Sequence, residues 1–181
     1  MKKWLMIVCC LFLACGLCGG ANAADQNISV TPVYGMYKVV SKDSNTMHMY
    51  GGQFEYRYGQ FAGGLEVLGI ATDVDKRHKY NWRSGFSGSG FFRYYILDPK
   101  EYWVTPFVGV GIGYAHSPYK LANDYRDHLT WNVDAGLKAD LCSFGDMKLN
   151  GILAARYQRF GSFRWNDVQA LGGYAGLGLS F

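Results

Sequence analysis

The feature that most constrains this chain is an alternation of apolar and polar residues with a period of two. It is clearest over residues 129–141, where Leu129 and Val133 belong to the apolar set and Asp134 and Lys138 to the polar set. Successive side chains of a β-strand point to opposite faces, so such a strand has one apolar and one polar face. No stretch after Ala24 has the roughly 18 consecutive apolar residues that a membrane-spanning helix needs. The pattern predicts an all-β protein.

We expect eight strands, at about residues 28–40, 47–58, 61–73, 84–97, 102–116, 129–141, 148–160 and 168–181. Short turns are expected at 58–60, 98–101 and 142–147, and longer polar loops at 41–46, 74–83, 117–128 and 161–167. In hydrocarbon every backbone N–H and C=O must be paired within the protein, which only helices and closed barrels achieve. The pattern therefore predicts an eight-stranded antiparallel up-and-down transmembrane β-barrel, with the longer loops outside the cell. Pro32 and Gly35 suggest a bulge that switches the phase of the first strand.

Residues 1–23 have the features of a signal peptide, which leaves 24–181 as the barrel. Lys2 and Lys3 precede an apolar run, and Ala21-Asn22-Ala23 offers small residues at a cleavage site. An alternative is a lipidated cysteine at Cys15 or Cys18, although the residues before both cysteines fit a lipoprotein signal poorly.

Cleavage would change the chemistry of the chain in two ways. Cys142 would be the one cysteine left, so no intramolecular disulfide could form. Loss of two lysines would lower the net charge from +4 to +2, too mild to indicate a nucleic-acid partner. The four histidines and this cysteine have no spacing typical of a metal site, and we expect no cofactor.

The polar faces should gather charged side chains inside the barrel. They are Glu55, Arg57, Glu66, Arg93, Asp134, Lys138, Asp140, Lys148 and Arg156. Residue counts from the short turns predict ion pairs between Glu66 and Arg93 and between Asp140 and Lys148. An unpaired buried charge costs several kcal/mol, so a connected network is expected. It could form a polar plug or a gated ion path, and we favour the plug because eight strands leave little interior room.

Two segments resemble a known family. The ending Gly176-Leu177-Gly178-Leu179-Ser180-Phe181 is similar to the signal that the outer-membrane assembly machinery recognises, with Gly176, Leu179 and Phe181 as its key positions and Ala175 as a departure from it. The run Pro106-Phe107-Val108-Gly109-Val110-Gly111-Ile112-Gly113-Tyr114 resembles a strand of small outer-membrane barrels of the OmpA, OmpX and opacity-protein type. The resemblance implies the outer membrane of a Gram-negative cell as location. A dinucleotide site is not expected at these glycines, because no helix follows them.

Aromatic and basic residues are expected where the barrel meets the membrane surfaces. Tyr56, Tyr58, Tyr94, Tyr102 and Trp103 should form a girdle near the short turns, and Tyr50, Trp82, Tyr114 and Trp131 one near the loops. In the loop 74–83, Lys76, Arg77 and Lys79 form a basic patch. This patch could bind lipopolysaccharide phosphates or an acidic host glycan, or it could simply be solvated.

The favoured function is a structural or surface-interaction role for a monomeric outer-membrane barrel in contact with lipid and lipopolysaccharide. A narrow or gated porin-like channel is the first alternative, and a lipid A modifying enzyme the second. The His-x-Ser-Asn motif of a lipid A deacylase would fall near Arg156–Arg159, where neither nucleophile nor base is present. His116 and Ser117 are adjacent, so a strand would aim them apart. We therefore expect no catalytic residues.

Overall fold

The computed structural model of the protein describes residues 28–40, 46–72, 84–121, 125–161 and 168–181, without the side chains of 72, 84, 117–121 and 125–126. The predicted signal peptide lies outside these ranges. The strands are β1 (Ile28–Val39), β2 (Thr46–Tyr58), β3 (Phe61–Thr72), β4 (Ser84–Tyr95), β5 (Val104–Leu121), β6 (Tyr125–Phe144), β7 (Met147–Phe160) and β8 (Val168–Ser180). No helix in the described part of the chain has the length and apolarity to cross a bilayer.

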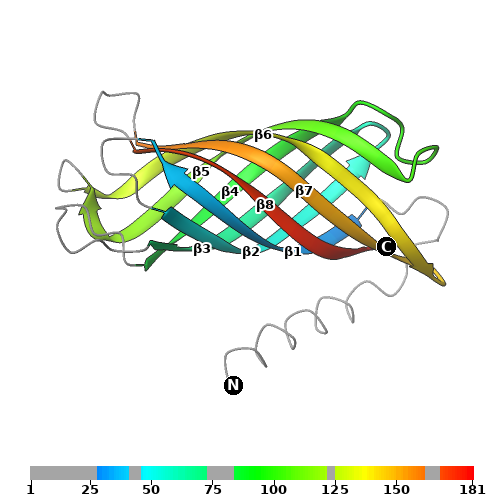
Figure 1. The fold of residues 1–181 in the computed structure, drawn as a ribbon, viewed down its shortest axis with the longest axis horizontal. Coiled ribbons are helices and arrows are strands. Elements are labelled where there is room, and N and C mark those ends of the chain that lie inside the picture. The colour runs from blue at the N-terminus through cyan, green and yellow to red at the C-terminus, as the bar shows by residue number, and fades with distance from the viewer. Residues whose placement is uncertain (1–27, 41–45, 73–83, 122–124, 162–167) are drawn as a thin grey trace, which may run out of the picture.

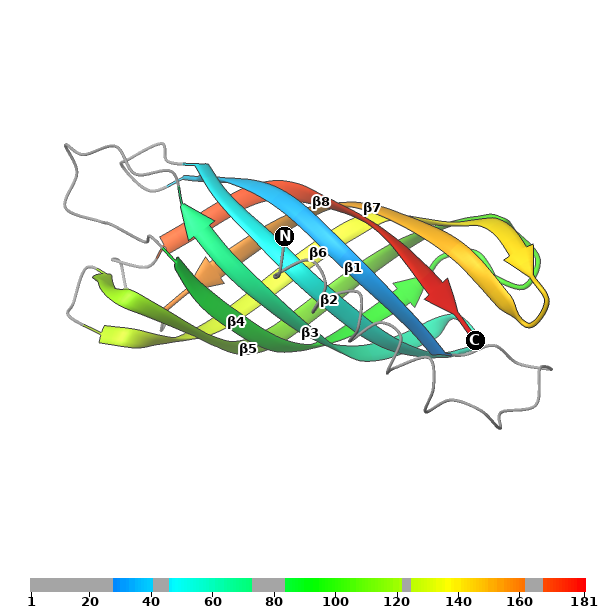
Figure 2. The same cartoon turned by 90° about the horizontal axis from the view of Figure 1, so that it is seen from below.

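The eight strands form one closed barrel in which each strand pairs with its sequence neighbours (Figure 1). All pairs are antiparallel, and β1 closes the barrel against β8. The strands are inclined to the long axis of the barrel, as the closure of a sheet requires (Figures 1 and 2). The predicted eight-stranded antiparallel barrel is confirmed.

Side chains alternate between the barrel interior and its outer wall along the strands, as the period-two pattern predicted, apart from a β-bulge near the end of β6. In β7, for example, Arg156 and Gln158 are buried inside while Leu153 and Ala155 are exposed on the outer wall. The expected phase switch in the first strand is wrong: inward residues alternate without interruption through β1, and its register with β2 is continuous. The pairing of β1 with β8 does have a gap, at Thr31 and Pro32.

The two ends of the barrel differ in their connections. At one end, called here the short-turn end, β2 joins β3 through Gly59 and Gln60, and β6 joins β7 through Gly145 and Asp146. Gly59 and Gly145 adopt the left-handed φ values of 59° and 58°, which glycine reaches without strain. Between β4 and β5 the Glu101 N–H donates to the Asp98 carbonyl at 3.0 Å, as expected of the turn predicted there.

The four connections at the opposite end each contain residues outside the described ranges: 41–45, 73–83, 122–124 and 162–167. This end is called the loop end. The loop predicted at 117–128 is wrong in extent, because β5 continues to Leu121 and β6 begins at Tyr125. The turn predicted at 142–147 is also too long, because β6 continues to Phe144 and β7 begins at Met147.

Candidate functional site

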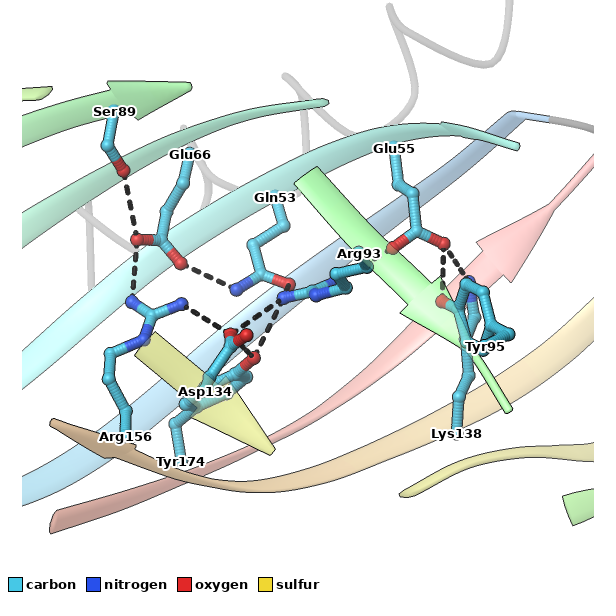
Figure 3. A network of polar contacts seen from close by, with 10 residues as sticks. All are labelled: Gln53, Glu55, Glu66, Ser89, Arg93, Tyr95, Asp134, Lys138, Arg156 and Tyr174. Carbon is cyan, nitrogen blue, oxygen red and sulfur yellow. Dashed lines mark hydrogen bonds and ion pairs between the residues drawn. The ribbon is translucent and has the colours of Figure 1, made fainter. Parts of the chain in front are cut away.

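The barrel interior contains a network of buried polar side chains that come from seven of the eight strands. Figure 3 shows all of its members except Ser29. Their members are Ser29 of β1, Gln53 and Glu55 of β2, Glu66 of β3, Ser89, Arg93 and Tyr95 of β4, Asp134 and Lys138 of β6, Arg156 of β7, and Tyr174 of β8. This set is called the interior network. The inward alternation of each strand places these groups inside the barrel, where they are buried.

Glu55 organises the part of the network nearest the short-turn end. Lys138 Nζ donates to Glu55 Oε1 at 2.7 Å, and the Tyr95 hydroxyl donates to the same oxygen at 2.8 Å. Arg93 Nη1 donates to Glu55 Oε2 at 2.8 Å. Lys138 also donates to Ser29 Oγ at 3.0 Å, which connects β6 to β1 across the interior. Both carboxylate oxygens of Glu55 are therefore satisfied by charged or hydroxyl donors.

Asp134 occupies the middle of the network. Its Oδ2 accepts a hydrogen bond from the Tyr174 hydroxyl at 2.7 Å and one from Arg156 Nη2 at 3.1 Å. Arg93 Nη2 lies 3.5 Å from the same oxygen and donates to Tyr174 Oη at 2.7 Å and to Gln53 Oε1 at 3.0 Å. One carboxylate thus binds both arginines.

Glu66 completes the network toward the loop end. Arg156 Nη1 donates to Glu66 Oε1 at 2.7 Å, and Ser89 Oγ donates to the same oxygen at 3.3 Å. The Gln53 amide donates to the other carboxylate oxygen. Because Gln53 also accepts from Arg93, it connects the Glu66 and Glu55 ends of the network.

The network is balanced in charge: Glu55, Glu66 and Asp134 supply three negative charges, and Arg93, Lys138 and Arg156 supply three positive charges. Removing one partner of a buried pair leaves the other charge uncompensated, at a cost of about 3–5 kcal/mol. The six groups therefore depend on one another. This arrangement holds strands on opposite sides of the barrel at fixed distances.

Aromatic rings lie against the guanidinium groups of the two arginines. The Arg93 guanidinium carbon lies 4.3 Å from the centroid of the Phe91 ring and 4.8 Å from that of Phe107. Arg156 lies 4.6 Å from the Tyr174 ring centroid. Cations over ring faces are stabilised electrostatically, and more strongly where water is excluded.

Apolar inward side chains, called here the apolar layer, lie between the network and the loop end, alongside the buried polar Asn132 and Gln158. Met47, Met49, Ile70 and Phe160 point inward near the loop-end termini of their strands and are fully buried. Arg93 and Arg156, at the level of the network, are each 1% exposed. A channel wide enough for water would expose the side chains that line it. At both levels the inward side chains named here are therefore closely covered by their neighbours.

β5 mainly provides space for the network, and its buried Thr105 donates to the Lys138 carbonyl rather than to a side chain of the network. A Cβ at Gly109 would lie 2.2 Å from Asp134 Oδ1 and 2.9 Å from Arg93 Cγ, and one at Gly111 would lie 2.7 Å from the Asn132 amide nitrogen. These contacts are far shorter than real Cβ atoms make. The glycines of the motif 106–114 are thus required by close packing inside the barrel.

The structure corrects one of the two ion pairs expected from sequence. Glu66 lies opposite Ser89, and its ion pair is with Arg156, so the predicted pairing of Glu66 with Arg93 is wrong. Asp140 and Lys148 are brought together, with 3.1 Å between Lys148 Nζ and Asp140 Oδ2 in a partly exposed position. Arg57 is half-buried and does not belong to the interior network as defined above.

Sequence reasoning missed the neutral members of the network. Gln53, Tyr95 and Tyr174 all occupy inward positions of the period-two pattern. Their place in that alternation was the signal that could have identified them. The prediction rested on charge alone. The hydroxyl and amide groups connect the charged groups, so they are as much a part of the site.

The three residues of the predicted assembly signal lie along β8 and just beyond it. The N–H of Phe181 donates to the Ile28 carbonyl at 2.8 Å, which extends the pairing of the first and last strands by one residue. Leu179 pairs with Leu149 and Val30 on either side. A Cβ at Gly176 would lie 2.4 Å from the Pro32 carbonyl oxygen, so this glycine allows a close approach of the two strands. The basic patch of Lys76, Arg77 and Lys79 lies outside the described residues.

His116, considered above beside Ser117, and His48 lie near the loop end. His116 Nδ1 is 2.6 Å from Asp127 Oδ1, and the Tyr114 hydroxyl donates to the same carboxylate, which the sequence had not indicated. His48 Nδ1 is 2.7 Å from the Tyr34 hydroxyl. Ser87 is buried inside the barrel. Among the described residues, no three or more His, Cys, Asp and Glu side chains form a group that could hold a metal ion.

Comparisons with known proteins identify the class of fold. No protein-family model matches the chain, and no curated protein matches it. The N-terminal β-barrel domain of OprF from Pseudomonas aeruginosa, known from a crystal structure, is 18% identical over 86% of this chain and 98% of that domain, with a TM-score of 0.54. A de novo designed transmembrane β-barrel is 16% identical over 83% of this chain and 95% of its own, with a TM-score of 0.41. The fold and interior define a closed antiparallel β-barrel with a polar core, the architecture of transmembrane β-barrels.

Proposed function

We propose that this protein is a non-enzymatic β-barrel of the Gram-negative outer membrane that acts as a rigid, non-conducting scaffold for the connections at its loop end. The observation that carries the proposal is the apolar outer wall. Its exposed side chains include Leu65, Val67, Val108, Val110, Ile112, Leu129, Val133, Leu137, Leu153, Leu171 and Leu177. This set is called the apolar belt.

A belt of this kind fits lipid and not water. Soluble monomers rarely expose contiguous apolar patches larger than a few hundred Å², whereas here apolar residues of all eight strands face outward. A soluble ligand-binding barrel would have the reverse arrangement, with the apolar face inside. The strands also have 12 to 20 residues, enough for the 9–11 that a tilted strand needs to cross the hydrocarbon.

The interior network supports a scaffold over a pore. Eight strands leave room for side chains, and here the interior network and the apolar layer occupy that room. Ion passage would require several mutually compensating groups to separate. The porin-like alternative therefore needs an open state that differs from the structure described here.

The proposal places the short-turn end in the periplasm and the loop end outside the cell. With residues 1–23 as a cleaved signal peptide, β8 and Phe181 would guide assembly through the machinery that inserts such barrels. At the loop end, the basic patch would meet lipopolysaccharide phosphates or an acidic surface glycan. The protein would be a monomer surrounded by lipid.

Reconstitution tests the location. The purified protein is expected to need detergent for solubility and to float with phosphatidylethanolamine and phosphatidylglycerol vesicles in a density gradient. A protein that stays monomeric and soluble in plain buffer and does not float would contradict the proposal.

Planar-bilayer recording separates the scaffold from the channel. We expect no conductance steps above those of the detergent blank. Reproducible steps that change in size when Arg156 or Glu66 is substituted would replace the scaffold with a narrow pore. Mass spectrometry of lipid A from cells with and without the protein tests the enzyme, and we expect identical spectra.

The ligand of the loop end can be tested with a triple variant that combines Lys76→Ala, Arg77→Ala and Lys79→Ala. We expect weaker binding to immobilised lipopolysaccharide than that of the unaltered protein, with the larger difference at low ionic strength. Lys100→Ala, at the short-turn end, is the control. Equal binding by both variants would remove the basic patch from the proposal.

A further inference from the structure

The hairpin formed by residues 141–147 extends past the end of the closed barrel. β5 begins at Val104, which pairs with Ala139, so β6 has no β5 residue beside it from 141 onward. On the other side, Lys148 forms the last pair of β7 with β8. Both views show the β6–β7 hairpin projecting beyond the C-terminal end of β8 (Figures 1 and 2).

A β-bulge at the base of this hairpin sets which side chains face outward. Asp140 pairs with Asn150 but Cys142 pairs with Leu149, so Leu141 is one extra residue in β6. The extra residue reverses the alternation and puts Cys142 on the outward face with Leu149. Phe144 and Met147, the pair next to the turn, then share this outward face.

The hairpin is consequently amphipathic. Leu141, Phe144 and Met147 face outward and are 51%, 59% and 39% exposed. They continue the apolar belt beyond Leu137 on the same side of the barrel. The inward face of the hairpin instead has Ser143 and Lys148, and Lys148 forms its ion pair with Asp140.

Aromatic residues at the base of the hairpin indicate the level of the lipid headgroups. The Asp140 N–H donates to the Trp103 carbonyl at 2.8 Å, and Trp103 is 73% exposed beside the exposed Tyr102. Trp and Tyr are enriched at membrane–water interfaces. Four further residues on a strand inclined by about 40° reach roughly 10 Å past this level. The headgroup layer is itself roughly 5–8 Å thick, so most of this span lies within it.

We propose that the hairpin 141–147 is an interfacial anchor whose outward face lies among the phospholipids of the leaflet at the short-turn end. The inference rests on the proposed membrane location. Its continuity with the apolar belt points to lipid as the occupant, because the same face of the same two strands also exposes Leu137 and Leu153. The hairpin would fix the depth and tilt of the barrel on the side of β6 and β7.

Cys142 provides a reporter inside the hairpin, since its thiol is exposed on the outward face. Protein isolated from the membrane would be labelled there with an environment-sensitive fluorophore, and mass spectrometry would verify the labelled position. It would then be inserted into phosphatidylethanolamine and phosphatidylglycerol vesicles. We expect blue-shifted emission, loss of emission when lipids with a headgroup nitroxide are added, and little quenching by aqueous iodide.

The neighbouring residue supplies a matched control. In the variant with Cys142→Ser and Ser143→Cys, the label faces inward one position away, and we expect it to be quenched by iodide and not by the nitroxide lipid. Iodide quenching of both labels alike would overturn the anchor. A Cys142 label shielded from both quenchers would also overturn it, because a protein partner or second copy would then cover the hairpin.

Two further variants separate the anchor from the membrane location. In the variant with Cys142→Ser and Leu137→Cys, the label lies in the apolar belt. If the nitroxide lipid quenches this label but not the one on Cys142, the anchor fails and the proposed function stands. If the nitroxide lipid quenches neither label, the anchor and the proposed membrane location both fail. Phe144→Asp is expected to shift the emission of the Cys142 label toward its value in water while the barrel remains inserted, and an unchanged emission would overturn the anchor.

Discussion

Arg156 is almost fully buried although its guanidinium carries a full charge. Glu66 and Asp134 compensate that charge at 2.7 Å and 3.1 Å. Glu66→Gln keeps the size of the side chain but leaves Arg156 with one carboxylate instead of two. We expect a loss of about 3–5 kcal/mol in the free energy of unfolding, because a buried charge loses its compensation. Urea titration in lipid vesicles, followed by tryptophan fluorescence, measures this change.

The partly exposed ion pair of Asp140 and Lys148 provides the control for that experiment. Its side chains are 28% and 39% exposed, so water screens the interaction. Lys148→Gln is therefore expected to change the free energy of unfolding by less than about 1 kcal/mol. Equal losses for the two variants would show that burial does not determine the strength of these pairs.

Gly109 tests how tightly the interior is packed. A methyl group at this position would overlap Asp134 Oδ1 and press on the Arg93 side chain. Gly109→Ala is expected to destabilise the barrel by about 1–3 kcal/mol, the usual cost of overpacking. Gly88→Ala is the control, because a Cβ there meets no atom within 4 Å. A stability unchanged in the first variant, or lost equally in both, would contradict close packing around β5.

At the scale of single elements, β8 combines two roles that one substitution can separate. Phe181 extends the pairing with Ile28 through its backbone, which Phe181→Ala leaves intact. We expect this variant to accumulate in the outer membrane in much smaller amounts, because the assembly machinery would recognise its ring. Leu177→Ala, which removes another outward side chain of β8, is the control.

The same two variants should then be refolded into vesicles without the machinery. There we expect them to unfold at similar urea concentrations, because both remove apolar surface from the outer wall. A Phe181→Ala variant that assembles normally in cells, or that is much less stable than Leu177→Ala when refolded, would argue against a recognition role for the ring.

The number and order of the strands could be predicted from the sequence, because lipid on one side and packed polar groups on the other impose one phase on each strand. The ends of β5 and β6 could not. Strands can also be extended by pairing with each other: Leu121 pairs with Tyr125, and residues 142–144 pair with β7, although a loop and a turn were predicted there. The bulge at Leu141 also reverses the inward–outward alternation of β6, and the polarity pattern alone does not reveal this reversal.

The interior network was predicted as a set but not as pairs. Counting from the turns compares residues on neighbouring strands, whereas the ion pair of Glu66 and Arg156 joins β3 to β7 across the barrel axis. Such partners depend on the stagger of the closed sheet and on the reach of long side chains. Neither quantity can be read from the local alternation of residues.

For the whole molecule, closure of the sheet and the interior network together predict slow unfolding in detergent. No strand can leave without breaking pairs on both sides and exposing buried charge. Unboiled samples are therefore expected to migrate at a different position from boiled samples on a detergent gel. Glu66→Gln should convert to the unfolded position at a lower temperature than the unaltered protein. Identical migration of boiled and unboiled samples would contradict a barrel that survives in detergent.

The gap between β1 and β8 at Thr31 and Pro32 makes this junction the expected site where the closed barrel opens under force. Proline has no N–H to contribute, and the ladder resumes only at Val33 and Gly176. A force that separates Ile28 from Phe181 acts first on this junction, where few hydrogen bonds lie between the gap and these two residues. Mechanical extraction is thus expected to separate the first and last strands before any other pair, with rupture starting beside Thr31 and Pro32.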